Sequence, residues 1–461
     1  MINFIWRAAG KKMTKIIANK FRQTQQDFHM YELIKGSSIA IILRVLAACL
    51  AFALNVILAR KLGASGSGVY FLALTIVMIG ASIGSIGMEQ VLVRFVASSI
   101  AIRQIGRVVG VYQKAMLFSL IAATLVSVCF CLYSPWVSQV VFTKPELAQP
   151  LMIMSLAIVP VALFTLHSYA LQGLKKVAAS ILIQGVVVPL LMCLIAVFFV
   201  ADFGISAMAL GYIFAALMSL ILGRWFWKNA VGSLEFEKAS FNRSELFTTS
   251  WPLFGVVLMS LIVSWLPMVF LGVWETSQDV GIYNAAFRTA ALTGFILVAV
   301  GSIATPKFAA LYQQGDLNTL EVVVRQSTWL VSFLALPIWL FLLVFSEQVL
   351  SIFGEEFKQG SVVLMILATG HFVNVATGLV GSLLMMTGHE RLVRNNLVLT
   401  GLMGVLWSLW LIPHYGVVGA AVSTALMLSM QNVIAVIQVW KKLNIIALPW
   451  VGIKNTGKVN R

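Results

Sequence analysis

The sequence predicts an all-α, polytopic membrane protein with about twelve transmembrane helices in two parallel six-helix repeats around a central cavity. Three observations predict this fold class. The 461 residues are 60% hydrophobic and only 10% charged, against about 25% charged residues in a soluble domain. The apolar residues form blocks of about 20, the length of a helix that crosses a bilayer core of about 30 Å. The two halves of the chain also resemble one another at a nearly constant spacing.

The apolar blocks define twelve spans in chain order, separated by short polar joints. A helix satisfies its own backbone hydrogen bonds, which a segment in lipid must do. The longest internal polar joint, 228–249, marks the boundary between the halves. The predicted spans are 37–59, 69–93, 112–132, 147–169, 177–200, 204–227, 250–272, 283–311, 326–346, 360–386, 394–413 and 416–440. The predicted domains are a basic amphipathic cytoplasmic segment 1–36, a first lobe 37–230, a cytoplasmic linker 231–249, a second lobe 250–440 and a cytoplasmic tail 441–461.

Basic residues are distributed unevenly between the two sides of these spans. The side that holds the N-terminus has 26 Lys and Arg, and the opposite side has four. This pattern predicts that both termini are cytoplasmic. Topology thus accounts for the net charge of +16, and no nucleic-acid partner is expected.

Basic and apolar residues alternate in segment 1–36 and around Arg94, Arg103 and Arg107. Such alternation is typical of helices that lie on the membrane surface. Two interpretations stay open for the three arginines. They anchor the chain on the inner leaflet, or they bind anionic lipid headgroups near a lateral opening.

Three short matches between the halves indicate an internal duplication. They are Gly68-Val69-Tyr70 with Gly281-Ile282-Tyr283 at a spacing of 213, Leu171-Gln172-Gly173 with Met386-Thr387-Gly388 at 215, and Gly204-Ile205 with Gly416-Val417 at 212. Because six spans are an even number, both copies enter the membrane in the same direction. Two such bundles around a cavity suit alternating access, in which one half rocks against the other.

Sequence motifs for catalysis or metal binding are missing. There is no Gly-x-x-x-x-Gly-Lys-Ser/Thr phosphate loop, and His389-Glu390 is not followed by the second His of a zinc peptidase. The four cysteines all fall inside apolar blocks. We therefore predict no enzyme activity, no metal site and no cofactor.

Arg44 in span 1 and Arg288 in span 8 are the two candidate substrate-binding residues. A charge inside a span is costly and is by default a functional hypothesis. At the repeat spacing of 213 their counterparts are Val257 and Thr75, so the charges were not part of the duplication. Either both guanidinium groups reach the nearest headgroups, or both line the cavity and bind phosphate bidentately. Glu89 lies near the inner end of span 2, and no span interior holds Asp or Glu, which predicts a positive cavity and an anionic cargo.

The chain resembles the bacterial polysaccharide transporters, the O-antigen and exopolysaccharide flippases. The resemblance rests on Leu58-Ala59-Arg60-Lys61-Leu62-Gly63 with Gly68-Val69-Tyr70, on Gln172-Gly173, on Gly388, and on Leu411-Ile412-Pro413 through Gly416-Val417-Val418-Gly419-Ala420-Ala421. It implies the multidrug, oligosaccharidyl-lipid and polysaccharide flippase superfamily, with two six-helix lobes. It also implies a polyprenyl-diphosphate-linked oligosaccharide as cargo (an O-antigen, capsule or exopolysaccharide repeat unit), and a pathway with a glycan polymerase and glycosyltransferases.

In lipid II flippases of that superfamily, arginines of spans 1 and 8 line a cationic cavity, and Arg44 and Arg288 match those helices by position. The chain lacks the two extra helices of lipid II flippases. A multidrug or cation antiporter of the same fold is an alternative, although it needs a carboxylate in the membrane. A membrane glycan polymerase or glycosyltransferase is a second alternative, which the short external joints disfavour.

Overall fold

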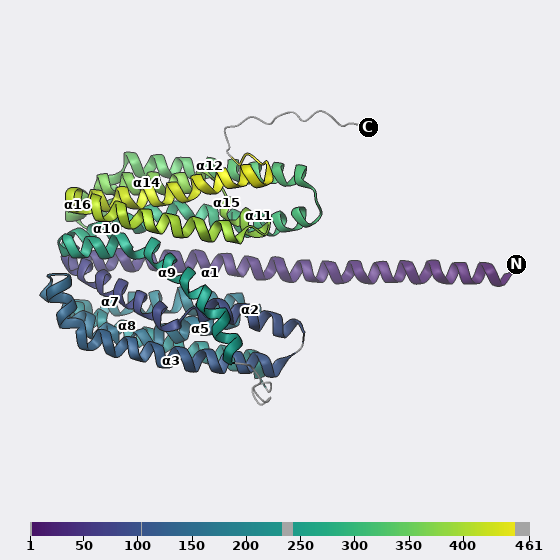
Figure 1. Cartoon of the computed structure of the whole chain (residues 1–461), viewed down its shortest axis with the longest axis horizontal. Helices are drawn as coiled ribbons and strands as arrows, with labels where there is room; N and C mark the ends of the chain where they lie inside the picture. Colours follow the sequence, from purple (N-terminus) through teal and green to yellow (C-terminus); the bar gives the residue numbers. More distant parts are fainter. Residues whose placement is uncertain (1, 103, 233–242, 448–461) are drawn as a thin grey trace.

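The computed structural model describes residues 2–102, 104–232 and 243–447, and these ranges contain helices and no β-strand (Figure 1). The first half contains α1 (Ile2–Ser85), α2 (Met88–Ala101), α3 (Ile105–Trp136), η1 (Val137–Val141), η2 (Pro145–Leu147), α4 (Ala148–Ser155), α5 (Ile158–Gly173), α6 (Val177–Ile181), η3 (Leu182–Val187), α7 (Val188–Phe198) and α8 (Val200–Val231). The second half contains α9 (Arg243–Trp274), α10 (Ser277–Ala291), η5 (Leu292–Gly294), α11 (Phe295–Gln313), α12 (Leu317–Val344), α13 (Ser346–Ser351), η6 (Glu355–Gly360), α14 (Ser361–Ala376), α15 (Val380–Met386) and α16 (Glu390–Leu443).

The helices confirm the all-α membrane fold class. Within the described ranges nine helical segments are long and apolar enough to cross a membrane, and a tenth is the bent pair α4 and α5. Two of the segments, Ile39–Ser85 and Glu390–Leu443, have 47 and 54 residues, which is twice the length that one span needs. If each of these counts as two spans, the total is the predicted twelve.

Glycines in the left-handed region mark where the long helices turn back. Gly63 has a φ of 69° and bends α1. Gly204 in α8 and Gly416 in α16 have φ and ψ of 55° and −138°, and of 54° and −131°. Two glycines 212 residues apart thus share one unusual conformation, which is the structural counterpart of the predicted duplication. The domain boundaries themselves are not tested by these features and stay a prediction.

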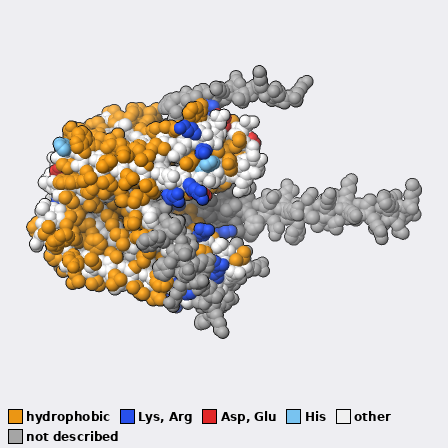
Figure 2. Space-filling model, in the orientation of Figure 1, with side chains coloured by type: hydrophobic (Ala, Val, Ile, Leu, Met, Phe, Trp, Pro, Cys, Tyr) orange, Lys and Arg blue, Asp and Glu red, His pale blue; other side chains and the backbone are white. Residues whose placement is uncertain are grey.

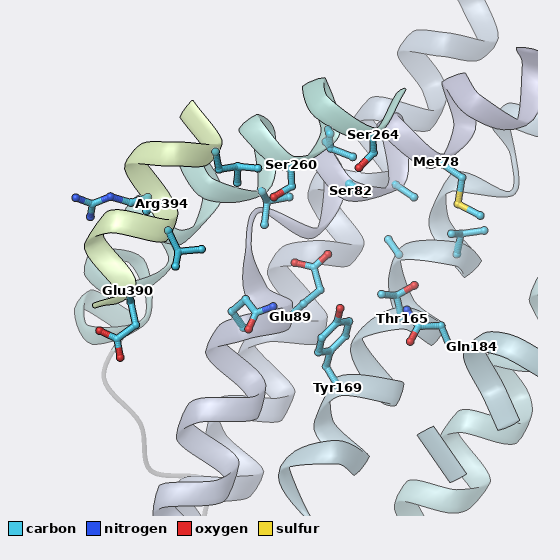
Figure 3. Close-up of a pocket in the computed structure, with 18 of the residues that line it drawn as sticks. Met78, Ser82, Glu89, Thr165, Tyr169, Gln184, Ser260, Ser264, Glu390 and Arg394 are labelled. Atoms are coloured by element: carbon cyan, nitrogen blue, oxygen red, sulfur yellow. The ribbon is translucent and has the colours of Figure 1, made fainter. Parts of the chain in front are cut away.

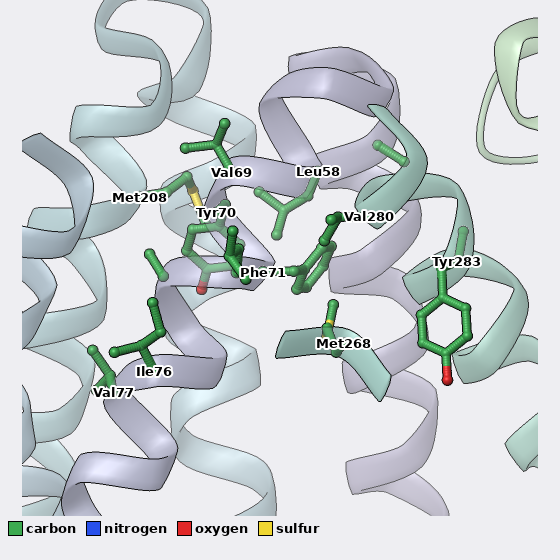
Figure 4. Close-up of a cluster of buried hydrophobic side chains, with 14 of the residues drawn as sticks. Leu58, Val69, Tyr70, Phe71, Ile76, Val77, Met208, Met268, Val280 and Tyr283 are labelled. Atoms are coloured by element: carbon green, nitrogen blue, oxygen red, sulfur yellow. The ribbon is translucent and has the colours of Figure 1, made fainter. Parts of the chain in front are cut away.

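The two halves share a core at one end of the bundle and have separate cores at the other. We call the end from which α1 enters the N-terminal side, and the end that holds Gly63 the far side. On the far side one buried cluster joins Tyr70 and Phe71 of α1 to Met268 of α9 and Val280 of α10 (Figure 4). On the N-terminal side, one cluster is made of residues 88–231 and another of residues 304–447. The halves are therefore in contact on the far side, and on the N-terminal side their cores are separate, although Gly87 of the first half packs against Phe254 of α9.

The surface matches a protein that sits in lipid. Figure 2 shows hydrophobic side chains over most of the visible described surface, with Lys and Arg gathered near the end from which α1 projects. The side chains of the predicted segment 1–36, residue Arg103, residues 233–242 of the predicted linker and residues 448–461 of the predicted tail lie outside what the structure describes.

Candidate functional site

The far side is closed by a close crossing of α1 and α10. A Cβ added at Gly68 would lie 1.7 Å from the Ser277 carbonyl oxygen, and one at Gly281 would lie 2.1 Å from the Ala64 carbonyl oxygen. Both pairs are related by the spacing of 213, since Ala64 corresponds to Ser277 and Gly68 to Gly281. The contact is therefore a pseudo-twofold one, in which each half presents the same patch to the other. Only glycine allows two backbones to approach this closely.

Polar contacts between the halves surround this crossing, and together with it we call them the far-side latch. Each joins a residue of the first half to a residue of the second. They are Arg60 Nε to the Ile352 carbonyl (2.7 Å), the Ala64 amide to Glu356 Oε1 (2.7 Å), Lys144 Nζ to the Gly272 carbonyl (2.5 Å), Ser277 Oγ to Glu146 Oε1 (2.9 Å) and Asn284 Nδ2 to Asn55 Oδ1 (3.0 Å).

Lys144 is the buried charge of the latch, with 6% of its surface exposed. Burial lowers the pKa of its amine, and the nearby carboxylates of Glu146, Glu275 and Asp279 oppose that shift. Burial and then the charge of Asp279 raise the pKa of Glu275, while Lys144 lowers it. Because Lys144 donates to a carbonyl group of the second half and lies near Glu275 and Asp279 of that half, this contact exists only while the halves are together on this side.

Between the halves lies a cavity of about 750 Å³. Its walls come from both halves and carry many hydroxyl and amide groups. From the first half it is lined by Met78, Ala81, Ser82, Glu89, Gln90, Val161, Ala162, Thr165, Tyr169 and Gln184, and from the second by Val257, Ser260, Leu261, Ser264, Met385, Glu390, Arg391, Val393, Arg394 and Leu397. In Figure 3, Glu89 and Tyr169 come from neighbouring helices of one wall, Ser260 and Ser264 from α9, and Glu390 and Arg394 stand at one edge.

The charges on these walls correct the prediction of a cavity without carboxylates. Glu89 and Glu390 line the cavity together with Arg391 and Arg394, so acidic and basic groups are equal in number. Glu89 was placed at the end of a span by hydropathy, but the chain breaks at Ile86 and Gly87, which have φ of 51° and 71°. The break turns α2 so that Glu89 faces the space between the halves.

Arg391 and Arg394 were missed as candidate residues. Arg391 lies in the joint before the predicted span 394–413 and Arg394 is the first residue of that span, where topology alone accounts for a basic residue. Their signal is their place in the first turns of α16, directly after the Gly388 turn that matches Gly173. Such a position in the sequence indicates only where a helix begins. The packing of α16 is what places Arg391 and Arg394 at the cavity.

The two predicted substrate-binding arginines are not brought together in this conformation. Arg44 is exposed on α1. Arg288 is half-buried in the last turn of α10, and within the described part its Nε is shielded from water without a hydrogen-bond partner. Thr75, the counterpart of Arg288, contacts Met268 Sδ at 3.2 Å across the halves. Thr75 also lies one helical turn before Met78 of the cavity wall, whereas Arg288 is not among the described residues that line the cavity.

The predicted headgroup-binding arginines lie on the N-terminal side of the first half. Arg94 is exposed on α2. The guanidinium carbon of Arg107 lies 5.5 Å from the centre of the Phe95 ring, a distance typical of a cation–π contact. Among the described residues no group of three or more His, Cys, Asp or Glu is arranged to hold a metal ion.

Comparison with known proteins connects this geometry to a family. Residues 57–362, about two thirds of the chain, match the family described as polysaccharide biosynthesis protein. The chain belongs to this family. The probable low-salt glycan biosynthesis flippase Agl15 of Haloferax volcanii is 29% identical over 51% of the chain and 50% of its own length. The probable flippase AglR of the same organism is 24% identical over 50% and 49%.

Solved structures share the fold of this member of the polysaccharide biosynthesis family. A multidrug resistance MATE family transporter, in an inward-facing conformation, superimposes with a TM-score of 0.71 at 14% identity, over 88% of the chain and 98% of its own. The lipid II flippase MurJ, in an inward closed conformation, gives 0.71 at 14% identity over 86% of both chains. The chain spans about half the length of the two Haloferax relatives that it matches.

Proposed function

We propose that the chain is a flippase that moves a polyprenyl-diphosphate-linked oligosaccharide across the cytoplasmic membrane by alternating access. One observation supports this proposal above the others. In a member of the polysaccharide biosynthesis family, a cavity with polar and charged groups on its walls lies between two halves that are closed on the far side by a pseudo-twofold crossing of α1 and α10. Opening that latch while the N-terminal side closes would present the same cavity to the other face of the membrane.

The walls of the cavity suit the two parts of such a cargo. Its volume lies within the range of about 300–1,000 Å³ that is usual for ligand sites. Hydroxyl and amide groups such as those of Ser260, Thr165 and Gln184 pair with sugar hydroxyls. Arg391 and Arg394 at the edge offer planar guanidinium groups, which bind phosphate oxygens bidentately. The lipid tail stays in the bilayer, because transferring each buried CH₂ to water costs about 0.8 kcal/mol.

Arg44 and Arg288 remain part of this proposal as diphosphate-binding residues. Arg288 has a shielded Nε without a partner among the described residues, and a buried donor without an acceptor is costly. A phosphate oxygen of the cargo that reached Arg288 would satisfy it. Arg44 is exposed on the stretch of α1 that leads into the bundle, where an entering headgroup would pass. Arg94, Arg103 and Arg107 are proposed to hold anionic headgroups on that same side.

The N-terminal side is proposed to be the cytoplasmic one, in agreement with the 26 basic residues on it. On this orientation the cavity is open to the leaflet where a lipid-linked oligosaccharide is assembled. The chain would act as a transporter and not as an enzyme, with glycosyltransferases supplying its cargo and a glycan polymerase using it. The names of Agl15 and AglR as probable flippases support this role.

The test is a flipping assay with the purified full-length chain in liposomes. A fluorescent polyprenyl-diphosphate oligosaccharide is placed in both leaflets, and an impermeant enzyme that modifies its sugar reports the accessible fraction. We expect that fraction to rise above the half that protein-free liposomes give. Liposomes that contain the chain and still stop at one half would contradict the proposal.

A second function, exchange of a lipophilic cation for protons, is favoured by one observation. Glu89 lines the cavity, and a carboxylate in that position is what such an antiporter needs. The same liposomes distinguish the two functions when they are loaded with a fluorescent lipophilic cation under a pH gradient. Cation efflux without oligosaccharide flipping would establish the antiporter in place of the flippase.

A further inference from the structure

Glu89 occupies a position that no part of the proposed cargo binding uses. It lies in the first turn of α2, directly after the break at Ile86 and Gly87. Its side chain is 8% exposed, yet it contributes to the cavity wall. In Figure 3 its carboxyl group points into the cavity beside the Tyr169 ring. A carboxyl group that is both buried and at a cavity wall can exchange a proton with the cavity water.

The hydrogen bonds around Ser85 indicate which form of Glu89 this conformation favours. Ser85 Oγ lies 2.8 Å from the Ser82 carbonyl oxygen and 2.5 Å from Glu89 Oε1. Both are acceptors when Glu89 is ionised, and a hydroxyl group has only one proton to donate. If Glu89 is protonated, its O–H donates to Ser85 Oγ, and the Ser85 hydroxyl donates to the Ser82 carbonyl. The protonated acid thus gives Glu89 Oε1, Ser85 Oγ and the Ser82 carbonyl oxygen each a hydrogen-bond partner.

The second carboxyl oxygen supports the same form. Glu89 Oε2 is shielded from water and, among the described residues, has no hydrogen-bond partner. A charge on such an oxygen would be poorly compensated. The groups facing Glu89 from the packed elements are Tyr169 of α5, Gln184 of η3 and Ser260 of α9, and Ser119 of α3 donates to the Ser85 carbonyl. Across the cavity stand Glu390, Arg391 and Arg394 of α16, and within the described ranges none of these forms an ion pair with Glu89.

The backbone at the break before Glu89 also contacts the second half. A Cβ added at Gly87 would lie 2.9 Å from the Phe254 amide nitrogen and 3.2 Å from the Ser250 carbonyl oxygen, both in α9 of the second half. Ile86, a β-branched residue at positive φ, is strained there. A change of charge at Glu89 therefore acts on a strained corner of the first half that rests against the backbone of the second.

We propose that Glu89 is a proton-binding site whose ionisation favours closure of the N-terminal side. In the present conformation the carboxyl group holds its proton. When the O–H bond breaks, the proton goes to the cavity water, and the carboxylate is drawn towards Arg391 and Arg394 on the opposite wall. Low pH then favours the conformation described here and high pH favours the opposite one. This inference takes alternating access from the proposed function, but its test needs no cargo.

The experiment measures the opening in the purified full-length chain without substrate. After replacement of the four free cysteines, Ala97→Cys on α2 and Asn395→Cys on α16 carry spin labels, because both residues are exposed. Distance distributions are recorded in lipid nanodiscs across about pH 5 to pH 9, a range that spans the usual shifts of a buried carboxyl group. For one coupled proton, the ratio of short-distance to long-distance populations is expected to rise by at most about tenfold per pH unit.

Two variants identify the residue responsible. Glu89→Gln keeps the shape of the protonated acid and its donor to Ser85, so it is expected to stay in the long-distance population at every pH. Glu390→Gln removes the other cavity carboxylate and should respond to pH as the wild type does. A wild type without a pH response, or a Glu89→Gln variant that responds as the wild type does, would overturn the inference. If the spin-label distances respond to pH as expected but the chain flips no oligosaccharide, only the proposed function is contradicted.

Discussion

Substituting Gly68 by Ala should open the far-side latch. The added Cβ would lie 1.7 Å from the Ser277 carbonyl oxygen, whereas real Cβ contacts keep at least about 3.0 Å. The α1 and α10 backbones must then separate by roughly 1.3 Å at the point where they cross. Overpacking of this kind costs about 1–3 kcal/mol, and the whole cost falls on the conformation with the latch closed. The equilibrium between the two conformations should therefore shift by about 5- to 150-fold towards an open far side.

Spin labels on the exposed residues Lys61 and Glu355, one from each half, report this shift as a longer distance. Gly281→Ala is the pseudo-twofold equivalent, since its Cβ would meet the Ala64 carbonyl oxygen at 2.1 Å, and it should give a shift of similar size. Gly294→Ala is the matched control, because nothing lies within 4 Å of its added Cβ and its φ of −69° suits alanine. If Gly68→Ala keeps the far-side distance of the wild type, the crossing of α1 and α10 is not the barrier that we describe.

Three further predictions concern cargo, orientation and energy. Arg44→Ala and Arg288→Ala should each lower affinity for the diphosphate by about tenfold to hundredfold, a loss of roughly 1.5–3 kcal/mol. Replacement of either arginine by Lys should restore function only partly, and surface glycan in cells that express each variant at the same level measures the loss. Wild-type glycan levels from the double Ala variant would favour the alternative in which both arginines reach the nearest lipid headgroups. Reporter fusions after Gly232 and after Arg461 should both read cytoplasmic, and an external signal at either would reverse the orientation. Flipping in liposomes should proceed without ATP, because the sequence has no phosphate loop; ATP-dependent flipping by the chain alone would contradict this.

Hydropathy predicted the fold well because a lipid-facing helix must be apolar along its whole length. The spans that it located agree with the helices even where the structure breaks them, as at α4 and α5 or at the π-helical η3. The repeat spacing was equally informative. It put Gly68 and Gly281 in equivalent places, and the structure shows that these two glycines contact equivalent carbonyls.

The candidate site was harder to predict because a cavity wall depends on how helices face each other. Hydropathy placed Glu89 at the end of a span, and the break at Ile86 and Gly87 that turns it inward leaves no apolar signature. By hydropathy Arg391 and Arg394 lie where a span begins, and the packing of α16 makes them cavity residues. Arg288 stays a predicted binding residue, and the structure adds that its Nε is shielded without a partner among the described residues.

The two halves have the same residue at the crossing of α1 and α10 and different residues at the charged positions that we propose to bind cargo or a proton. The crossing of α1 and α10 needs a close backbone approach in each half, so glycine is retained at both Gly68 and Gly281. At the same spacing, Glu89 corresponds to Ser302 and Arg288 to Thr75, so the charges near the cavity occur in one half only. A symmetric contact can open and reform between two similar halves, whereas a cargo with a charged end and a sugar end needs walls that differ. A difference between the two halves at these positions is what a transporter of an asymmetric molecule requires from a duplicated fold.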